Sequence, residues 1–215
     1  MSLRIRNSLE RADWIFAREV CALTGNAGDP IDPERSPFFG EQWVAPYERL
    51  RPEWTYIAEE NGNRLGYLTG SPDTLGFNRS EFWAHRLPLF IRTYLGRYPK
   101  NRDVEVFRAR FLAVLSRDRE NLGPADRFPV AATRAVLEEY PAHLHMNLVR
   151  EARGKGVGTA LVDRFRADLV RAGIHGIHLY CGEKPRPFYE RIGFRVLDQI
   201  EFRPGFDVYR LGSRF

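Results

Sequence analysis

Apolar residues at positions 157–172 recur with helical spacing. One face carries four of them, each four residues apart: Val157, Leu161, Phe165 and Leu169. Charged residues, among them Asp163 and Arg164, fall on the opposite side, and Gly173 follows the last turn. An apolar stripe of this kind, closed by a glycine, predicts an amphipathic helix.

The segments on either side of this helix have the pattern of strands. Residues 142–149 alternate between apolar and polar side chains and follow Pro141, and residues 174–181 form a second short apolar run. A glycine-rich turn joins the first strand to the helix. We therefore expect a unit of strand, glycine turn, helix and strand.

The N-terminal part predicts a second group of elements. In order, they are a strand at residues 3–6, a helix capped by Ser8 and running to about Leu23, a Gly- and Pro-rich loop at 25–40, a short helix at 41–50 and a hairpin at 54–70. Asn61-Gly62 stands at the bend of the hairpin, and this dipeptide favours a two-residue turn.

Residues 71–140 have the pattern of ordered helices rather than of a linker. Val104, Phe107, Phe111 and Val114 mark one helix, and a helix over residues 80–87 should end or kink at Pro88. Two interpretations of this insertion stay open. It is either a structural cap or dimer contact, or a lid over a substrate.

Composition restricts the class of protein. The chain has 215 residues and is 43% hydrophobic, enough for one substantial core, so a single domain over residues 1–215 is expected. No apolar run is long enough to span a bilayer, and the first residues lack an apolar signal region, so we expect a cytoplasmic protein without membrane association. Two cysteines are too few for a disulfide framework or a zinc cluster, and no metal site is predicted.

The net charge of +5 raises the question of a polyanionic partner. The basic residues are spread along the sequence, and almost all are arginine. No nucleic-acid-binding motif accompanies them, so we expect an anionic cofactor rather than nucleic acid, which remains a third alternative.

The glycine turn has the pattern of a phosphate site. Residues 153–158 read Arg-Gly-Lys-Gly-Val-Gly at the start of a helix, where unpaired N–H groups and the helix dipole favour an anion. A nucleotide P-loop is excluded because Lys155 lies between glycines, and a dinucleotide fingerprint is excluded because Thr159 stands where glycine is required. A connection without any ligand is the remaining alternative.

The R-x-x-G-x-G pattern of Arg153 to Gly158 resembles the acetyl-CoA pyrophosphate loop of the GNAT N-acetyltransferase superfamily. A second run, RPFYERIGFRVL at residues 186–197, is similar to the C-terminal signature of the same superfamily. The resemblance implies an α/β (α+β) fold, in which helices flank a twisted, mainly antiparallel mixed sheet. Residues 71–140 would then be a helical insertion between the third and fourth strands.

A narrower resemblance rests on YPAHLHMNL and FRPGFDVYRLG. These runs are similar to a bacterial acetyltransferase-like domain that is related to the C-terminal domain of animal O-GlcNAcase. The animal domain is regarded as a pseudo-acetyltransferase without the cofactor loop, whereas this chain has the loop. Gly182 stands where the superfamily often has an asparagine seven residues before the tyrosine, which puts a contact of that side chain in doubt.

The resemblance assigns acetyl-CoA to a defined set of residues. Backbone groups of the fourth strand would pair with the pantetheine arm, the turn would hold the pyrophosphate, and Phe188 of the second motif would also contact the cofactor. The expected cofactor-binding residues are Met146, Asn147, Leu148, Arg153, Gly154, Lys155, Gly156, Val157, Gly158, Thr159 and Phe188.

Acetyl transfer to an amine also needs a base and an acid. His143 and His145 alternate onto one face of the predicted strand and are candidates for the base, whereas Glu59 and Glu60 on the hairpin are second candidates. By the resemblance, Tyr189 lies beside the thioester sulfur and would protonate the leaving thiolate. For the histidines and Tyr189 alike, packing or hydrogen bonding without catalysis is the alternative.

Together these patterns predict an N-acetyltransferase that moves the acetyl group of acetyl-CoA to a primary amine by direct attack in a ternary complex. The alternative is a CoA-binding or pseudo-acetyltransferase module that recognises a protein partner without turnover. The acceptor, the identity of the base, the role of the insertion and a homodimer all stay open.

Overall fold

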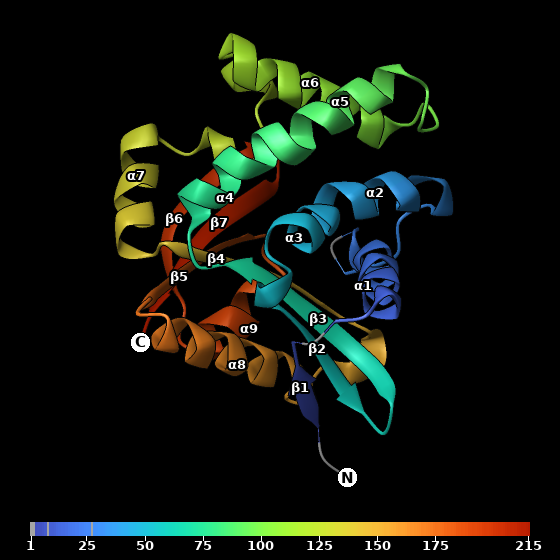
Figure 1. Ribbon diagram of the computed structural model, residues 1–215. Coiled ribbons are helices and arrows are strands. Elements are labelled where there is room, and N and C mark those ends of the chain that lie inside the picture. Colours follow the sequence, from blue (N-terminus) through green and yellow to red (C-terminus); the bar gives the residue numbers. More distant parts are fainter. Residues whose placement is uncertain (1–2, 8, 27) are drawn as a thin grey trace. The chain divides into compact units, whose positions relative to one another are not determined.

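The computed structural model describes residues 3–7, 9–26 and 28–215. Its helices and strands are shown in Figure 1. The chain divides into two compact units. The first contains the chain up to Asp73, His143–His175 and Phe215, and the second contains Thr74–Ala142 and Gly176–Arg214.

The first unit contains four strands that pair antiparallel with their neighbours. In order they are β1 (Arg4–Arg6), β2 (Thr55–Glu60), β3 (Asn63–Ser71) and β4 (Ala142–Leu148). Asn61 and Gly62 both have positive φ at the bend between β2 and β3, as the two-residue turn requires. The predicted hairpin is therefore confirmed.

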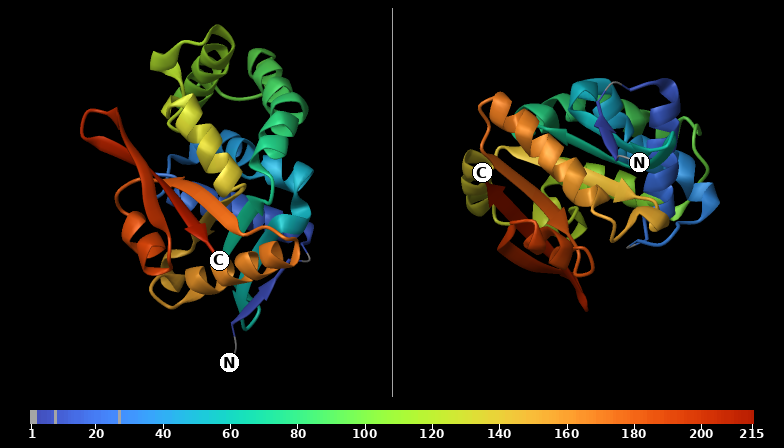
Figure 2. Two further views of the ribbon diagram at one scale, coloured as in Figure 1. Left: turned by 90° about the vertical axis from the view of Figure 1, so that its left-hand side faces the viewer. Right: turned by 90° about the horizontal axis from the view of Figure 1, so that it is seen from below.

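Helices cover both faces of this sheet. They are α1 (Arg11–Thr24), α2 (Ser36–Trp43), α3 (Ala45–Leu50) and α8 (Val157–Arg171), with short 3-10 turns η1 (Pro33–Arg35), η2 (Pro52–Trp54) and η6 (Arg150–Ala152). Figure 2 shows α8 lying across β1, β2 and β3. Gly70 of β3 faces this helix, and a Cβ there would come within 2.5 Å of the Phe165 ring.

The opposite face of the sheet packs against α1. Tyr67, three residues before Gly70, points to this side, as the alternation of a strand requires. The buried core of this face contains Trp14, Ala17, Val20, Cys21, Val44, Ile57 and Tyr67.

The N-terminal elements differ from the prediction in two respects. Helix α1 starts after Glu10, whose backbone N–H donates to the Asp13 carboxylate over 2.8 Å; the predicted cap, Ser8, lies outside the described residues. The predicted loop at residues 25–40 is wrong in its second half, since α2 begins at Ser36. Pro37 fits the first turn of a helix, where no N–H partner is needed, and its presence misled the prediction.

The second unit contains the other three strands, β5 (Gly176–Cys181), β6 (Arg195–Arg203) and β7 (Phe206–Arg214), with β7 antiparallel to both of its neighbours. Its α-helices are α4 (Thr74–Glu81), α5 (Leu87–Tyr94), α6 (Arg102–Ser116), α7 (Val130–Glu139) and α9 (Arg186–Arg191). Short turns complete it: η3 (Phe82–Arg86), η4 (Arg119–Asn121) and η5 (Ala125–Arg127).

Pro88 does not end the helical segment. A π-helical turn, η3, directly precedes it and joins α4 to α5. Since proline lacks the N–H that a regular helix needs, the wider turn takes up the irregularity. The rings of Phe82 and Phe90 both stack on Phe111 of α6, at 5.6 and 4.2 Å between centroids.

The strands of the second unit enclose a buried arginine. Arg210 on β7 is almost completely buried and donates to Asp198 and to Thr133, each over 2.9 Å. Its guanidinium also lies 4.5 Å from the centroid of the Phe128 ring. These contacts join α7 to the β6–β7 hairpin.

The predicted fold class is confirmed. Strands pair antiparallel within both units, helices flank them, and the insertion between the third and fourth strands is helical. No helix in the described parts of the chain has both the length and the apolar character to cross a bilayer.

Candidate functional site

The glycine turn lies at the N-terminus of α8, as the sequence predicted for a phosphate site. Gly154 and Gly156 have φ values of +74° and +78°, which side-chain-bearing residues rarely adopt. A Cβ at either position would meet no atom within 4 Å, so the turn is open to solvent. In the described part of the chain no side chain caps the helix, whose first N–H groups have no partner within it.

The basic residues of the turn differ in their contacts. Arg153 donates to the backbone oxygen of Gly28 over 3.0 Å and is exposed. Lys155 is also exposed, between the two glycines. Val157 and Gly158 begin α8 and are buried. The turn therefore offers backbone N–H groups and positive side chains on one exposed surface, which is the chemistry that binds a diphosphate.

A polar cluster lies on the face of β4 that α1 covers. The Asn147 amide is at its centre: Nδ2 donates to the Tyr67 hydroxyl over 2.8 Å, and Oδ1 accepts from the Thr24 hydroxyl over 2.8 Å. The same Nδ2 lies 2.9 Å from Nε2 of His145. The Asn147 side chain, for which only a backbone role was predicted, therefore holds three elements together.

His145 is enclosed by aromatic groups. The Trp43 ring of α2 stacks on its imidazole with centroids 6.3 Å apart and planes at 17°, and the Tyr67 ring lies 6.0 Å away. Its Nε2 is 3.9 Å from Sγ of Cys21. Burial lowers the pKa of His145 to about 4, because a charged imidazole would lose its hydration there. The ring is therefore neutral near pH 7.

His143 has a different environment on the same face of β4. Its Nε2 lies 3.0 Å from the Tyr47 hydroxyl of α3, and the two rings meet edge to face. A hydrogen bond to one ring nitrogen fixes the orientation and tautomer of the imidazole. His143 is the candidate base that Tyr47 orients.

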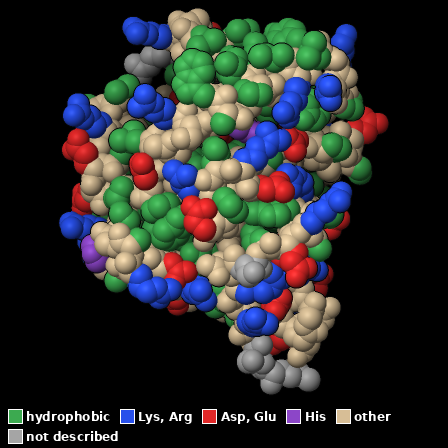
Figure 3. All heavy atoms as spheres, in the orientation of Figure 1, with side chains coloured by type: hydrophobic (Ala, Val, Ile, Leu, Met, Phe, Trp, Pro, Cys, Tyr) green, Lys and Arg blue, Asp and Glu red, His purple; other side chains and the backbone are tan. Residues whose placement is uncertain are grey.

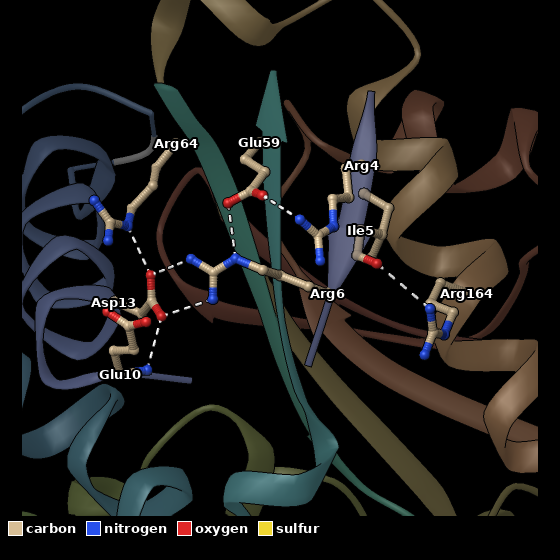
Figure 4. A network of polar contacts seen from close by, with 8 residues as sticks. All are labelled: Arg4, Ile5, Arg6, Glu10, Asp13, Glu59, Arg64 and Arg164. Carbon is tan, nitrogen blue, oxygen red and sulfur yellow. Dashed lines mark hydrogen bonds and ion pairs between the residues drawn. The ribbon is translucent and has the colours of Figure 1, made fainter. Parts of the chain in front are cut away.

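Glu59, one of the two second candidates for the base on the hairpin, has structural partners. The Glu59 carboxylate accepts from Nε of Arg6 over 2.7 Å, and Arg4 lies 3.6 Å away. Figure 4 shows this carboxylate within a network that ends on Asp13 and Arg64. These contacts with arginines occupy the carboxylate and join β1 to β2, so Glu59 is assigned to structure.

Met146 and Leu148 follow the register of β4. They pair with Leu68 and Gly66 of β3, with Asn147 opposite Tyr67 between them. A Cβ on Gly66 would lie 2.3 Å from a methyl group of Leu148, so glycine is required for this pairing.

Tyr189 lies on α9 in the second unit. It is buried, and its ring meets Phe188 and Phe194 edge to face at 5.0 and 5.5 Å. Burial raises its pKa well above the ordinary value, and the nearby Cys181 adds to the shift. Among the described residues, its hydroxyl has no hydrogen-bond partner. The phenol therefore keeps its proton at neutral pH.

Neither a cavity beside α8 nor any cluster of possible metal ligands among the described residues is assigned as a functional site. A cavity of about 250 Å³ is lined by Asn7, Glu53, Trp54, Tyr56, Arg164, Asp168 and Arg171. Three of its charged groups pair with one another, since Asp168 accepts from Arg164 and forms an ion pair with Arg171, and Asp168 also accepts from the Tyr56 hydroxyl. No group of acidic, histidine or cysteine side chains suited to a metal occurs among the described residues.

The sequence did not single out the partners of the histidines. Trp43 and Tyr47 both lie in the segment predicted as a short helix at residues 41–50, but that prediction assigned them no role beside the histidines. Phe39, Trp43 and Tyr47 are four residues apart, and Phe39 and Trp43 are in ring contact at 6.1 Å. This aromatic spacing is the signal that identifies the side of α2 and α3 that faces β4.

The comparisons with known proteins agree with this description. Residues 125–196 match the family model described as Acetyltransferase (GNAT) domain, a segment that contains β4, the glycine turn and α9. The crystal structure of SsHAT matches with a TM-score of 0.72 and 29% identity, over 100% of this chain and 98% of that one.

Two other solved structures have the same fold at lower identity. A GCN5-related N-acetyltransferase from Kribbella flavida matches with a TM-score of 0.54 and 18% identity, over 99% of this chain and 98% of that one. The structure of yncA from Salmonella typhimurium with its cofactor acetyl-CoA matches with a TM-score of 0.54 and 14% identity, over 100% and 94%. These two structures show the fold alone, whereas the match of residues 125–196 to the GNAT family model supports acetyl transfer as the general activity.

Proposed function

We propose that this chain is an acetyl-CoA-dependent N-acetyltransferase that acetylates a primary amine by direct attack within a ternary complex. The observation that carries the proposal is the open glycine turn at the uncapped start of α8, in the segment that matches the GNAT domain. Its N–H groups suit a pyrophosphate, which is a feature of CoA.

In this proposal, the N–H groups of residues 154–159 bind the pyrophosphate, assisted by the charges of Arg153 and Lys155. The backbone of Met146, Asn147 and Leu148 pairs with the pantetheine arm, and Phe188 packs beside it. A cofactor held along its length in this way leaves only the acetyl group to be positioned for attack.

The chemical step transfers one proton from the amine and one to the sulfur. We assign the base to His143, because His145 is a weak base with its lowered pKa and its hydrogen bond to Asn147. The amine nitrogen forms a bond to the acetyl carbon, His143 takes the proton directly or through water, and the C–S bond breaks. The products are an N-acetylated amine and CoA.

Tyr189 is the proposed donor to the leaving thiolate, on the strength of its place in the second motif. Burial keeps this phenol protonated at neutral pH, because its raised pKa disfavours the phenolate. A cytoplasmic location and a relation to the O-GlcNAcase C-terminal domain remain predictions.

The test is turnover over a panel of acceptors. The chain is incubated with acetyl-CoA and small amines, aminoglycosides or lysine-containing peptides, release of the CoA thiol is followed, and products are identified by mass spectrometry. The proposal expects thiol release that depends on one acceptor class. Saturable acetyl-CoA binding without turnover of any acceptor would instead support the pseudo-acetyltransferase module.

A further inference from the structure

The helical segment α4–η3–α5 is apolar on two sides. One side packs inside the second unit through Phe77, His85, Leu89 and Thr93, which are all buried. The other side presents large apolar residues that are each at least half exposed: Trp83, Ile91, Tyr94 and Leu95. A surface helix normally carries polar residues on its outer side, so this second apolar side needs an explanation.

Helix α6 extends the same surface. Leu112 and Leu115 lie one turn apart and are 47% and 59% exposed. Arg108, one turn before Leu112, places its guanidinium 4.2 Å from the centroid of the Tyr94 ring and donates to the Thr93 hydroxyl over 2.9 Å. The exposed sides of the two helices are thus in contact through this arginine.

These six residues, Trp83, Ile91, Tyr94, Leu95, Leu112 and Leu115, are named the α5–α6 surface. Figure 3 shows hydrophobic side chains gathered over α5 and α6, with basic groups at their margin. Contiguous apolar surface of this kind on a folded protein marks a site of interaction.

The charge of this region is one-sided. Residues 74–116 contain eight Lys or Arg and three Asp or Glu, so their net charge of +5 equals that of the whole chain. Arg79, Arg97, Lys100 and Arg102 are exposed, and none of them has an ion-pair partner in the parts of the chain that the structure describes. The remainder of the chain is neutral in sum.

We propose that the α5–α6 surface binds an anionic lipid bilayer, with both helices lying on the membrane. The apolar side chains would enter the boundary between headgroups and acyl chains, where tryptophan and tyrosine are favoured, and the basic residues would meet lipid phosphates. This proposal departs from the expectation of no membrane association, which rested on the lack of an apolar run long enough to span a bilayer. Binding on the surface requires no such run.

The positive charge of this region favours an anionic bilayer over a second copy of the chain as the partner of the α5–α6 surface. In a pairing of this surface with a second copy, two regions of net charge +5 would face each other, and like charges oppose such an interface. An acidic protein would satisfy the charge, but it would also need a shape complementary to projecting side chains. A fluid bilayer adapts to them.

The test is sedimentation of the full chain with vesicles. We expect it to bind vesicles of phosphatidylcholine with phosphatidylglycerol and not vesicles of phosphatidylcholine alone. Raising the salt from about 0.05 to about 0.5 M should release it, because the Debye length falls severalfold. Equal binding to both vesicles, or no binding to either, would overturn the proposal.

Two pairs of substitutions distinguish vesicle binding by the α5–α6 surface from nonspecific binding by exposed apolar residues elsewhere. Ile91→Ser with Leu95→Ser should weaken binding at least tenfold. Ile15→Ser with Val170→Ser, a pair on α1 and α8 that is 48% and 45% exposed, should leave it unchanged. Circular dichroism shows that each pair is folded. Vesicle binding by Ile91→Ser with Leu95→Ser that equals the binding of the wild type contradicts the proposal. A wild-type dimer in light scattering that these two substitutions dissociate also contradicts it.

Discussion

Nε2 of His143 lies 3.0 Å from the hydroxyl of Tyr47, and the two rings meet edge to face with centroids 5.8 Å apart. The pair joins β4 to α3, which the sequence separates by 96 positions. His145, two residues on, is instead stacked on Trp43 and hydrogen-bonded to Asn147. One strand thus presents two histidines whose environments differ.

The first prediction separates these histidines. If His143 is the base, His143→Gln lowers kcat/KM by about 10²- to 10⁴-fold and removes the histidine inflection from the pH profile of log(kcat/KM). Tyr47→Phe keeps the ring but removes the hydroxyl, and should lower the rate less. The measurement is a full pH profile for each variant.

The matched control is His145→Gln, which should retain the inflection because His145 is already neutral. If His145→Gln loses the inflection and His143→Gln keeps it, the assignment of the base is wrong.

The second prediction concerns Tyr189. Tyr189→Phe keeps the packing against Phe188 and Phe194 but has no proton to donate. We expect acetyl-CoA affinity to survive while kcat falls roughly tenfold to a thousandfold, the loss typical of one general acid. Calorimetry measures the affinity and a thiol assay the rate. An unchanged kcat would assign Tyr189 to packing, and a parallel loss of affinity would assign it to cofactor binding.

The third prediction tests the network in Figure 4. Asp13 on α1 is fully buried and accepts from Arg6 over 2.6 and 2.8 Å and from Arg64 over 2.6 Å. Burial alone would raise its pKa, but the hydrogen bonds from Arg6, the Glu10 backbone and Arg64 outweigh it and hold the pKa well below the ordinary value. The carboxylate therefore joins β1, α1 and β3 in its charged form.

Asp13→Asn should lower the free energy of unfolding by about 2–3 kcal/mol. This is less than the roughly 3–5 kcal/mol for a fully buried pair, because the arginines keep partial access to water. Arg4→Ala is the control, since Arg4 is 72% exposed and 3.6 Å from Glu59, and should cost at most about 1 kcal/mol. Urea unfolding measures both, and equal losses would contradict the central position of Asp13.

The fourth prediction follows from His178 on β5. Its Nδ1–H donates to the Tyr140 carbonyl over 2.7 Å, and burial lowers its pKa to about 4. The unfolded chain, in which the pKa is about 6.5, therefore binds more protons between these values, so stability rises with pH across this window. As the pH falls from about 6.5 to about 4, His178 costs the fold at most about 3 kcal/mol, and His145 acts in the same direction.

Urea unfolding at pH about 7.5 and about 5 measures this dependence. His178→Asn keeps an N–H donor but does not titrate, so the difference between the two pH values should become smaller in this variant. A wild type equally stable at both values, or a variant with the same difference, would contradict the origin assigned to it.

Local patterns predicted the framework of the site. The alternation of β4, the glycines at 154 and 156 and the apolar stripe of α8 each act over a few residues, so the sequence alone identified strand, turn and helix. The same holds for the hairpin with Asn61-Gly62. These features depend on backbone geometry and on burial of one face.

Contacts between residues far apart in the sequence could not be predicted from local patterns. Thr24 and Asn147 are 123 positions apart, and nothing local in either indicates that they bond. Likewise, proline and glycine between residues 25 and 40 indicated a loop, whereas burial of Phe38 and Gly40 stabilises a helix there. Tertiary packing outweighs local preference at such places.

The most direct test of the central claim is a calorimetric titration of acetyl-CoA into Gly156→Asp. A carboxylate at the start of α8 would meet the pyrophosphate with like charge, so affinity should fall by roughly a hundredfold or more. Gly62→Asp is the matched control, since Gly62 has the same φ of +78° and equally open surroundings at the bend between β2 and β3. Loss of binding in Gly156→Asp with wild-type affinity in Gly62→Asp is the predicted result, and a folded Gly156→Asp that binds acetyl-CoA as tightly as the wild type would contradict it.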